Sequence, residues 1–463
     1  MLFSGIPFLF YFLPCVLLVY FAVPQKGRNA VLLAASLFFY GWGEPKFLLF
    51  MVFSIVQGYI FARLIERGRR KKLFLTLSLM LSFALLGYCK YADFFIENVS
   101  AVTGLSLPLL KIALPIGISF YTFQIAGYEI DVYRGNVAAQ RNFIDFAAYV
   151  AMFPQLIAGP IVRYRDIAAQ LRERTHSLEA AASGASRFAV GLGKKVLVAN
   201  VLAQLVSAYK ASAEPTALYA WLYAIAFTLQ IYFDFSGYSD MAIGLGRIFG
   251  FTFPENFRYP YIAKSITEFW RRWHMSLGTW FRDYLYIPLG GSRCSRARHI
   301  FNILIVWMAT GFWHGAAWNF IFWGLFYAAL LMAEKFFLLP ALQKGRLLPH
   351  VYVLLAVTLG FVIFDAASMN DALHRLGLLF GVGAVPGPGT EALYMLRSYG
   401  IVLALAVLGA TPLPAMLWKK VREAAPLTPV FTVAEPLCTL ALLALCTAFL
   451  VDGSFNPFLY FRF

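Results

Sequence analysis

Two histidines with aromatic neighbours stand out in an otherwise very apolar chain. His274 closes the segment FWRRWH, and His314 lies within the segment GFWHGAAWN. Placing a titratable imidazole among membrane-spanning apolar residues costs free energy, and the charge of the ring changes near neutral pH. A histidine in such a sequence therefore usually has a functional role. His314 is therefore the first candidate for a catalytic residue.

The surroundings of the two histidines differ. Gly311 and Gly315 flank His314 and allow another backbone or a ligand to approach closely. His274 falls on the apolar side of its helical pattern, where the commoner alternative is a packed core histidine with one hydrogen bond. The remaining histidines lie in polar or loop-like contexts and are assigned no role: His176, His299, His350 and His374.

The segment that carries His274 has the pattern of a surface helix. From Ser265 to Tyr286 apolar residues recur at three-and-four spacing, and charged residues take the opposite face. Glu268 lies one helical turn before Arg272, within reach of an ion pair. We expect one amphipathic helix at the cytoplasmic membrane boundary.

Composition places these residues in a membrane protein. The 463 residues are 60% hydrophobic and only 13% charged, with a mean hydropathy of +0.69. The chain therefore has more apolar surface than the core of one soluble protein needs. We predict an all-α polytopic protein with about 11–13 transmembrane helices, plus re-entrant and amphipathic segments. The spanning candidates are 5–23, 30–43, 47–64, 73–92, 108–127, 186–206, 216–236, 300–316, 318–338, 350–366, 399–417 and 432–451.

Aromatic residues and broken segments suggest an interior site. The 46 Phe, 25 Tyr and 10 Trp exceed the needs of two interfacial belts, so many must pack between helices or line a cavity. Apolar stretches broken by proline and glycine, at 153–160 and 254–260, are tolerated at membrane depth only against protein or a water-filled cavity.

Basic residues predict the orientation. The net charge of +16 comes from short clusters between apolar runs, which fits the positive-inside rule better than nucleic-acid binding. The first apolar run lacks the basic flank and Ala-x-Ala site of a signal peptide, so we read it as a retained helix. Both termini are then expected outside the cytoplasm, and the cluster at 63–72 inside.

The whole chain reads as a single membrane domain, 1–463, with a terminal helix and extracytoplasmic tail at about 432–463. The five cysteines are far apart or wrongly spaced, so neither a disulfide nor a metal site is predicted.

Several segments, in this order along the chain, resemble membrane-bound O-acyltransferases, and in particular the bacterial alginate O-acetyltransferase branch. They are PIGISFY at 115–121, DVYRG at 131–135, FPQLIAGP at 153–160, YFDFSGYSDMA at 232–242 and the two histidine motifs. The resemblance implies a helical membrane fold around a central funnel or tunnel. It also implies that His314 matches the invariant catalytic histidine and that His274 lies on the cytoplasmic side of the same passage.

The resemblance implies the reaction as well. The donor is a cytoplasmic acyl thioester, for this branch acetyl-CoA, with no bound cofactor. Moving acetyl from a thioester to a hydroxyl needs a base of near-neutral pKa, and an unperturbed histidine, at about 6.5, suits this role. His314 is the expected base.

Supporting residues are proposed from motif proximity. Donors for the developing oxyanion, which needs a dry site, would come from Trp313, Trp318, Asn319 and Tyr238. Asp234 and Asp240 either orient a histidine or form structural salt bridges. Arg271 and Arg272 either meet the donor's phosphates or anchor a helix at anionic headgroups.

The C-terminal residues suggest an acyl relay. The pattern Phe-x-Tyr-x-x-Phe around Tyr460 resembles the C-terminal motif of a small partner peptide in D-alanylation systems of this superfamily. There the tyrosine is proposed to carry the acyl group outward. The alternative is an interfacial aromatic anchor.

Two functional hypotheses follow. The first is an O-acetyltransferase of the bacterial inner membrane that modifies an extracytoplasmic polysaccharide through an exported SGNH-hydrolase-like partner. Alginate, peptidoglycan, cellulose and other exopolysaccharides all remain open as acceptors. The second is a transporter or channel, which broken segments would also permit, although the inverted repeats typical of transporters are not found.

Overall fold

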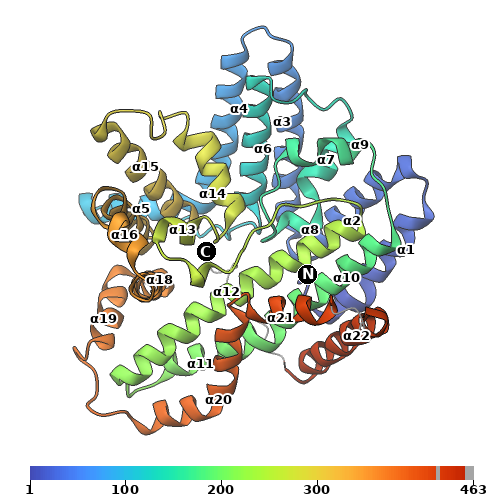
Figure 1. Cartoon of the computed structure of the whole chain (residues 1–463). Coiled ribbons are helices and arrows are strands. Elements are labelled where there is room, and N and C mark those ends of the chain that lie inside the picture. The colour runs from blue at the N-terminus through green and yellow to red at the C-terminus, as the bar shows by residue number, and fades with distance from the viewer. Residues whose placement is uncertain (424–427, 454–463) are drawn as a thin grey trace. The chain divides into compact units, whose positions relative to one another are not determined.

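The described part of the chain is mostly helical. The computed structural model describes residues 1–423 and 428–453. Within those ranges no strand forms, and Thr216 and Val385 make an isolated bridge. Figure 1 shows the arrangement as helices joined by turns and irregular chain. The prediction of an all-α protein is confirmed.

Among residues 1–423 and 428–453, eight helices are long and apolar enough to cross a membrane, and each overlaps a predicted span. The chain is therefore a multi-pass membrane protein. The eight are Pro45–Glu66, Lys71–Thr103, Leu178–Ala211, Ala217–Ile248, Trp318–Lys344, Leu348–Asp365, Thr390–Gly409 and Thr432–Asp452.

The predicted figure of 11–13 also counted shorter or more polar apolar runs. The first of these is the apolar helix Phe8–Ala22. The expected span at 108–127 is helical only from Ile118 onward. Pro108 and Pro115 interrupt the earlier part, and Gly117, with φ +75°, sits in the left-handed region just before the helix begins.

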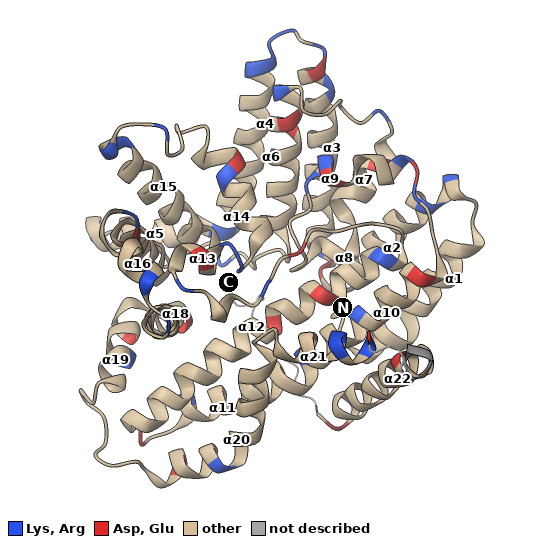
Figure 2. Cartoon of the chain, in the orientation of Figure 1, with Lys and Arg blue, Asp and Glu red and all other residues tan. Residues whose placement is uncertain are grey.

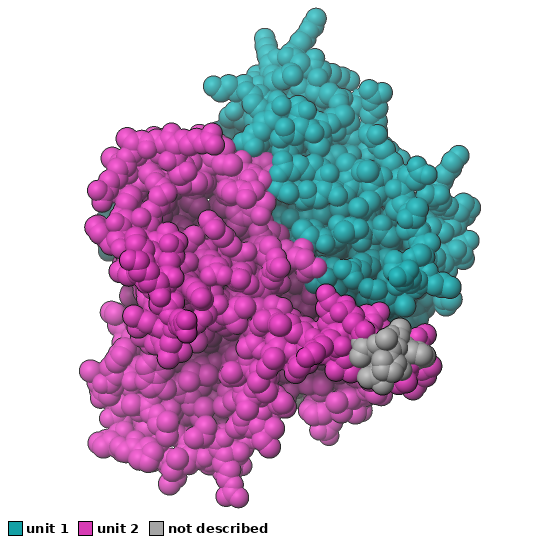
Figure 3. Space-filling model, in the orientation of Figure 1, with its two compact units in different colours: residues 1–188, 241–254 teal, residues 189–240, 255–463 magenta. Residues whose placement is uncertain are grey.

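The helices group into two compact units, coloured separately in Figure 3. Unit 1 contains residues 1–188 and 241–254, and unit 2 contains residues 189–240 and 255–463. Two long helices, α10 (Leu178–Gly193) and α12 (Ala217–Ile248), contribute residues to both.

Unit 1 is built around α3, α4 and α6, which contact one another. In the turn between α3 and α4, Figure 2 shows the basic cluster used above to predict orientation. The elements are η1 (Phe8–Phe12), α1 (Leu13–Ala22), η2 (Gln25–Gly27), α2 (Arg28–Gly43), η3 (Pro45–Phe47), α3 (Leu48–Glu66), α4 (Lys71–Leu86), η4 (Gly87–Tyr91), α5 (Ala92–Thr103), α6 (Ile118–Arg134), α7 (Phe143–Ala151), α8 (Phe153–Leu156) and α9 (Tyr164–Arg172).

The broken apolar segment predicted at 153–160 lies within unit 1. It contains the short helix α8 and a turn, and every residue from 151 to 162 is buried. Its irregular backbone is thus covered by protein, as a break at membrane depth requires.

Unit 2 holds both histidines of interest. Helices α15 and α16 contact each other, α16 also contacts α18, and α18 contacts α19. The elements are η5 (Lys194–Ala199), α11 (Asn200–Ala211), η6 (Pro260–Ile262), α13 (Ile266–Trp270), α14 (Met275–Phe281), η7 (Arg282–Tyr286), α15 (Arg296–His314), α16 (Trp318–Ala333), η8 (Glu334–Leu338), α17 (Leu339–Lys344), α18 (Leu348–Asp365), α19 (Met369–Leu379), α20 (Thr390–Gly409), α21 (Leu413–Arg422) and α22 (Thr428–Asp452).

Candidate active site

His314 is the last residue of α15, at the tight turn into α16. The two helices touch backbone to backbone: a Cβ added at Gly311 would lie 2.2 Å from the carbonyl oxygen of Phe320. A Cβ at Gly315 would lie 2.1 Å from the Phe320 ring, and one at Gly324 would lie 2.2 Å from the oxygen of Trp307. The close approach expected from the glycines is therefore made by protein, and it fixes the end of α15.

The imidazole of His314 is half-buried and surrounded by aromatic rings. Its ring centroid lies 4.9 Å from that of Trp313, 5.1 Å from Trp323 and 5.2 Å from Phe364, all in edge-to-face contact. These rings come from α15, α16 and α18, so three packed helices position the side chain.

His274 occupies the break between α13 and α14. It is only 2% exposed, and its backbone is left-handed, with φ +45° and ψ +51°. That conformation costs an L-residue roughly 1–2 kcal/mol and persists only where its surroundings enforce it. The predicted apolar location is confirmed.

Aromatic rings from separate elements enclose His274. Phe235 of α12 lies 4.6 Å away, between ring centroids, and Trp313 lies 6.0 Å away. Trp313, which is 4% exposed, therefore neighbours both histidines. Burial lowers the pKa of His274 well below its ordinary value, so this ring is neutral at neutral pH.

The prediction of one amphipathic helix from Ser265 to Tyr286 is wrong. The segment contains two short α-helices and a π-helix, interrupted at residues 271–274. The cause is a competing backbone partner: Arg258 N donates to Arg272 O at 2.9 Å, and Met275 N donates to Asn256 O at 3.0 Å.

The apolar face of this segment is buried by protein, and Ile266, Phe269 and Trp273 belong to the hydrophobic core of unit 2. Its buried residues include Ile266, Phe269, Trp273, Leu277 and Trp280.

Glu334 fixes the start of α13 and was not anticipated. Its carboxylate is 0% exposed and accepts hydrogen bonds from the backbone N–H groups of Ile266 and Thr267 and from the Thr267 hydroxyl. A carboxylate at a helix start satisfies donors that the helix itself leaves open. In the sequence, the only indication of this role is that Glu334 is a charged residue at the end of an apolar run.

The two aspartates of the YFDFSGYSDMA segment have lysine partners. Asp234 lies 2.6 Å from Lys195, with both side chains 3% exposed, and Asp240 lies 2.7 Å from Lys194. The structural salt bridges weighed from the sequence are therefore present. Tyr238 lies between them in α12 and is buried.

The asparagine and tryptophan after His314 lie differently. Asn319 is buried, and its Nδ2 donates to the backbone oxygens of Ile363 at 3.4 Å and Ala366 at 2.9 Å, which ties the start of α16 to the end of α18. Trp318 is 51% exposed.

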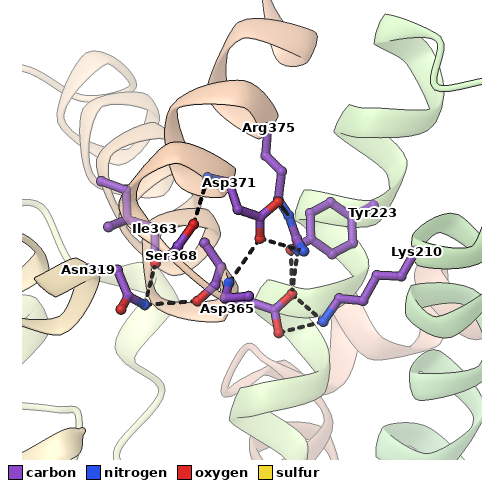
Figure 4. A network of polar contacts seen from close by, with 10 residues as sticks. Lys210, Tyr223, Asn319, Ile363, Asp365, Ser368, Asp371 and Arg375 are labelled. Atoms are coloured by element: carbon purple, nitrogen blue, oxygen red, sulfur yellow. Dashed lines mark hydrogen bonds and ion pairs between the residues drawn. The ribbon is translucent and has the colours of Figure 1, made fainter. Parts of the chain in front are cut away.

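Asp365, directly after the Phe364 that touches His314, anchors a polar network shown in Figure 4. Its carboxylate contacts Lys210 at 2.5 Å and Arg375 at 3.1 Å, and it accepts a hydrogen bond from the Tyr223 hydroxyl at 2.5 Å. The network holds α11, α12, α18 and α19 together beside the candidate site. The residues of this network are far apart in the sequence, so no local sequence pattern predicts it.

The two arginines before His274 lie on the polar side. Arg272 pairs with Glu268 at 2.8 Å, as predicted. Arg271 is exposed. Tyr460, the relay candidate, lies outside the described residues.

Comparisons with known proteins show the family to which this helical membrane protein belongs. Residues 137–344 match the profile of the membrane-bound O-acyltransferase family. The chain is 46% identical to the probable alginate O-acetylase AlgI of Azotobacter vinelandii over 392 residues, which cover 83% of this chain and 79% of the relative. The chain belongs to the membrane-bound O-acyltransferase family.

Two further relatives are named as enzymes of cell-envelope polymers. It is 34% identical to the peptidoglycan O-acetyltransferase of Helicobacter pylori, with 83% of this chain and 81% of the relative covered. It is 30% identical to the teichoic acid D-alanyltransferase of Bacillus subtilis, with 55% of this chain and 69% of the relative covered. The chain is thus a membrane O-acyltransferase, which decides against a transporter or channel.

Proposed function

We propose that the protein takes acetyl from a cytoplasmic thioester, acetyl-CoA, and passes it across the bacterial inner membrane for O-acetylation of an extracytoplasmic polysaccharide. The acceptor is an alginate-like exopolysaccharide or peptidoglycan, reached through an exported SGNH-hydrolase-like partner. The observation that carries this proposal is the half-buried imidazole of His314, held by Trp313, Trp323 and Phe364 at the junction of α15 and α16.

In the proposed reaction, neutral His314 removes the proton of an acceptor hydroxyl as its oxygen attacks the thioester carbonyl. A C–O bond forms and the C–S bond then breaks. The imidazolium returns the proton to the leaving thiolate, which departs as free thiol. The aromatic surroundings keep water from competing for the thioester.

Other residues have supporting roles in the proposal. His274 lines the cytoplasmic part of the passage, and exposed Arg271, with Arg272, meets the phosphates of the donor. Tyr238 and Trp313 are the buried candidates for oxyanion donors. Tyr460 would supply the acceptor hydroxyl of this step. Its acetyl ester would then pass the group on at the outer end, because a phenolate, with a parent pKa of about 10, leaves more readily than an alkoxide.

The test is release of free thiol from acetyl-CoA by the purified protein, supplied with the exported partner and a polysaccharide acceptor. His314→Gln keeps size and hydrogen bonding but cannot act as a base, so we expect a loss of about 100-fold or more. His374→Gln is the matched control, because His374 is exposed on α19 and has no assigned role. Wild-type turnover in His314→Gln would remove this histidine from the mechanism.

A further inference from the structure

Asn256 lies against His274 and is completely buried, with 0% exposure. Its backbone oxygen accepts a hydrogen bond from Met275 N at 3.0 Å, and its side-chain Oδ1 accepts one from Ser276 N at 3.2 Å. These bonds attach Asn256 to the first turn of α14, directly after the histidine. His274 is the N-cap residue of α14, but its side chain accepts no hydrogen bond from the first turn. Asn256 accepts these hydrogen bonds instead.

The backbone fixes which way the Asn256 amide faces. A main-chain N–H can only donate, so the side-chain atom facing Ser276 N is the carbonyl oxygen. The amide nitrogen points the opposite way and donates to Ser239 Oγ at 3.0 Å. The reverse orientation would place an NH₂ group against the N–H of Ser276, two donors without an acceptor.

The same oxygen determines where the proton of His274 sits. Oδ1 of Asn256 lies 3.2 Å from His274 Nδ1. Because the oxygen bears no hydrogen, Nδ1 must be the protonated, donating nitrogen of the neutral ring. The lone pair is then on Nε2, which is buried and has no hydrogen-bond partner among residues 1–423 and 428–453.

We propose that Asn256 is a positioning residue that holds His274 as the Nδ1–H tautomer, so that Nε2 accepts a hydrogen bond from an O–H or N–H group of a substrate. A buried acceptor left open is costly, and a substrate donor relieves that cost. The acceptor hydroxyl and the amide N–H groups of the thioester donor both have this chemistry. The inference rests on the proposed function, in which His274 lines the passage of the substrates.

Two substitutions at Asn256 separate positioning from packing. Asn256→Leu keeps the volume but removes the acceptor, so the tautomer is no longer enforced, and we expect kcat/KM to fall about tenfold or more. Asn256→Asp keeps an oxygen facing Nδ1 and adds a negative charge. That charge raises the pKa of His274, so the acid limb of the kcat/KM profile should move to higher pH.

A second background tests whether Asn256 acts through the histidine. In His274→Gln protein, Asn256→Leu should cause no further loss of activity. Asn302→Leu is the matched control: Asn302 is also 0% exposed in unit 2 and donates to Gly291 O at 3.0 Å. It should lower thermal stability without moving the acid limb.

The two substrate sources give different results. If the partner of Nε2 is an amide of the donor, Asn256→Leu raises KM for acetyl-CoA and leaves turnover of an acetyl thioester of a simple alkanethiol, which lacks amides, unchanged. If the partner is the acceptor hydroxyl, both thioesters are affected equally.

A direct readout does not depend on activity. Nitrogen NMR of ¹⁵N-histidine-labelled protein, with the His274 signals assigned by their loss in His274→Gln, should show a pyridine-type Nε2 and a protonated Nδ1. A protonated Nε2, or a His274 pKa that Asn256→Asp leaves unmoved when these signals are followed with pH, overturns the inference. Neither NMR result depends on His314, so the inference and the proposed base can fail separately.

Discussion

The two histidines are held in different ways, and the difference suits different roles. His274 is 2% exposed, left-handed and tied to Asn256, whereas His314 is half-buried at the end of a helix. A fully buried imidazole stays neutral and serves as a fixed acceptor. A half-buried one is able to gain and lose a proton during turnover, which is why we propose His314 as the base.

A third histidine, assigned no role from the sequence, is a structural acceptor. Arg28 Nη1 donates to His176 Nδ1 at 2.9 Å, and the Tyr20 hydroxyl lies 3.0 Å from Nε2. Burial, followed by the charges of Arg28 and Arg174, lowers the pKa of His176.

His176 should therefore make stability depend on pH. Its folded pKa lies below the unfolded value of about 6.5, so its contribution to the free energy of unfolding is complete above that pH. The contribution is lost as the pH falls from there toward the folded pKa. Thermal unfolding across this window should show a smaller acid destabilisation in His176→Gln than in wild type. An identical pH dependence in the two proteins would show that His176 is not held neutral.

At the scale of elements, the contact between α10, η5 and α12 is close and charged. Within unit 2, a Cβ added at Gly237 would lie 2.7 Å from Gly191 O, so the backbones touch. The ion pair of Lys195 and Asp234 is buried next to this contact, and Lys195 lies in the π-helix η5 that follows α10. Short π-helical segments often accompany functional sites.

Breaking this ion pair on one side should be worse than removing it whole. Asp234→Leu leaves a buried ammonium and should lower the free energy of unfolding by about 3–5 kcal/mol, whereas Lys195→Met with Asp234→Leu should recover most of it. Thermal unfolding in detergent measures both. If the double variant also keeps acetyl transfer, Asp234 is structural; if it folds but is inactive, the alternative that Asp234 orients a histidine gains support.

The elements also show what could be read from the sequence. Most long apolar runs were predicted close to the observed helices because hydropathy is a local property, and His274 and His314 were singled out as candidates because imidazole is rare in such a sequence. The break at residues 271–274 was missed, since the backbone partners that end the helix come from 256–258. Asn256 was missed for the same reason. In the sequence it is only an asparagine in a proline-flanked segment, and the contact that suggests its role is made with a residue eighteen positions away.

At the scale of the whole molecule, the chain is a multi-pass membrane protein, and the reaction proposed for it has a direction. Basic residues lie in the turn between α3 and α4 (Figure 2), and the positive-inside rule predicts that this turn is cytoplasmic. The donor thioester is cytoplasmic in the proposed reaction and the polysaccharide is outside. The central claim therefore concerns both the chemistry at His314 and the side from which the donor enters.

Oriented membrane vesicles test that claim most directly. Acetyl-CoA does not cross a bilayer freely, so it is added to inside-out vesicles, which expose the cytoplasmic face, and to right-side-out vesicles from the same cells. Release of free thiol is measured in each, for wild type and for His314→Gln. The account predicts thiol release from inside-out vesicles of the wild type alone. Equal release from right-side-out vesicles, or undiminished release with His314→Gln, would contradict it.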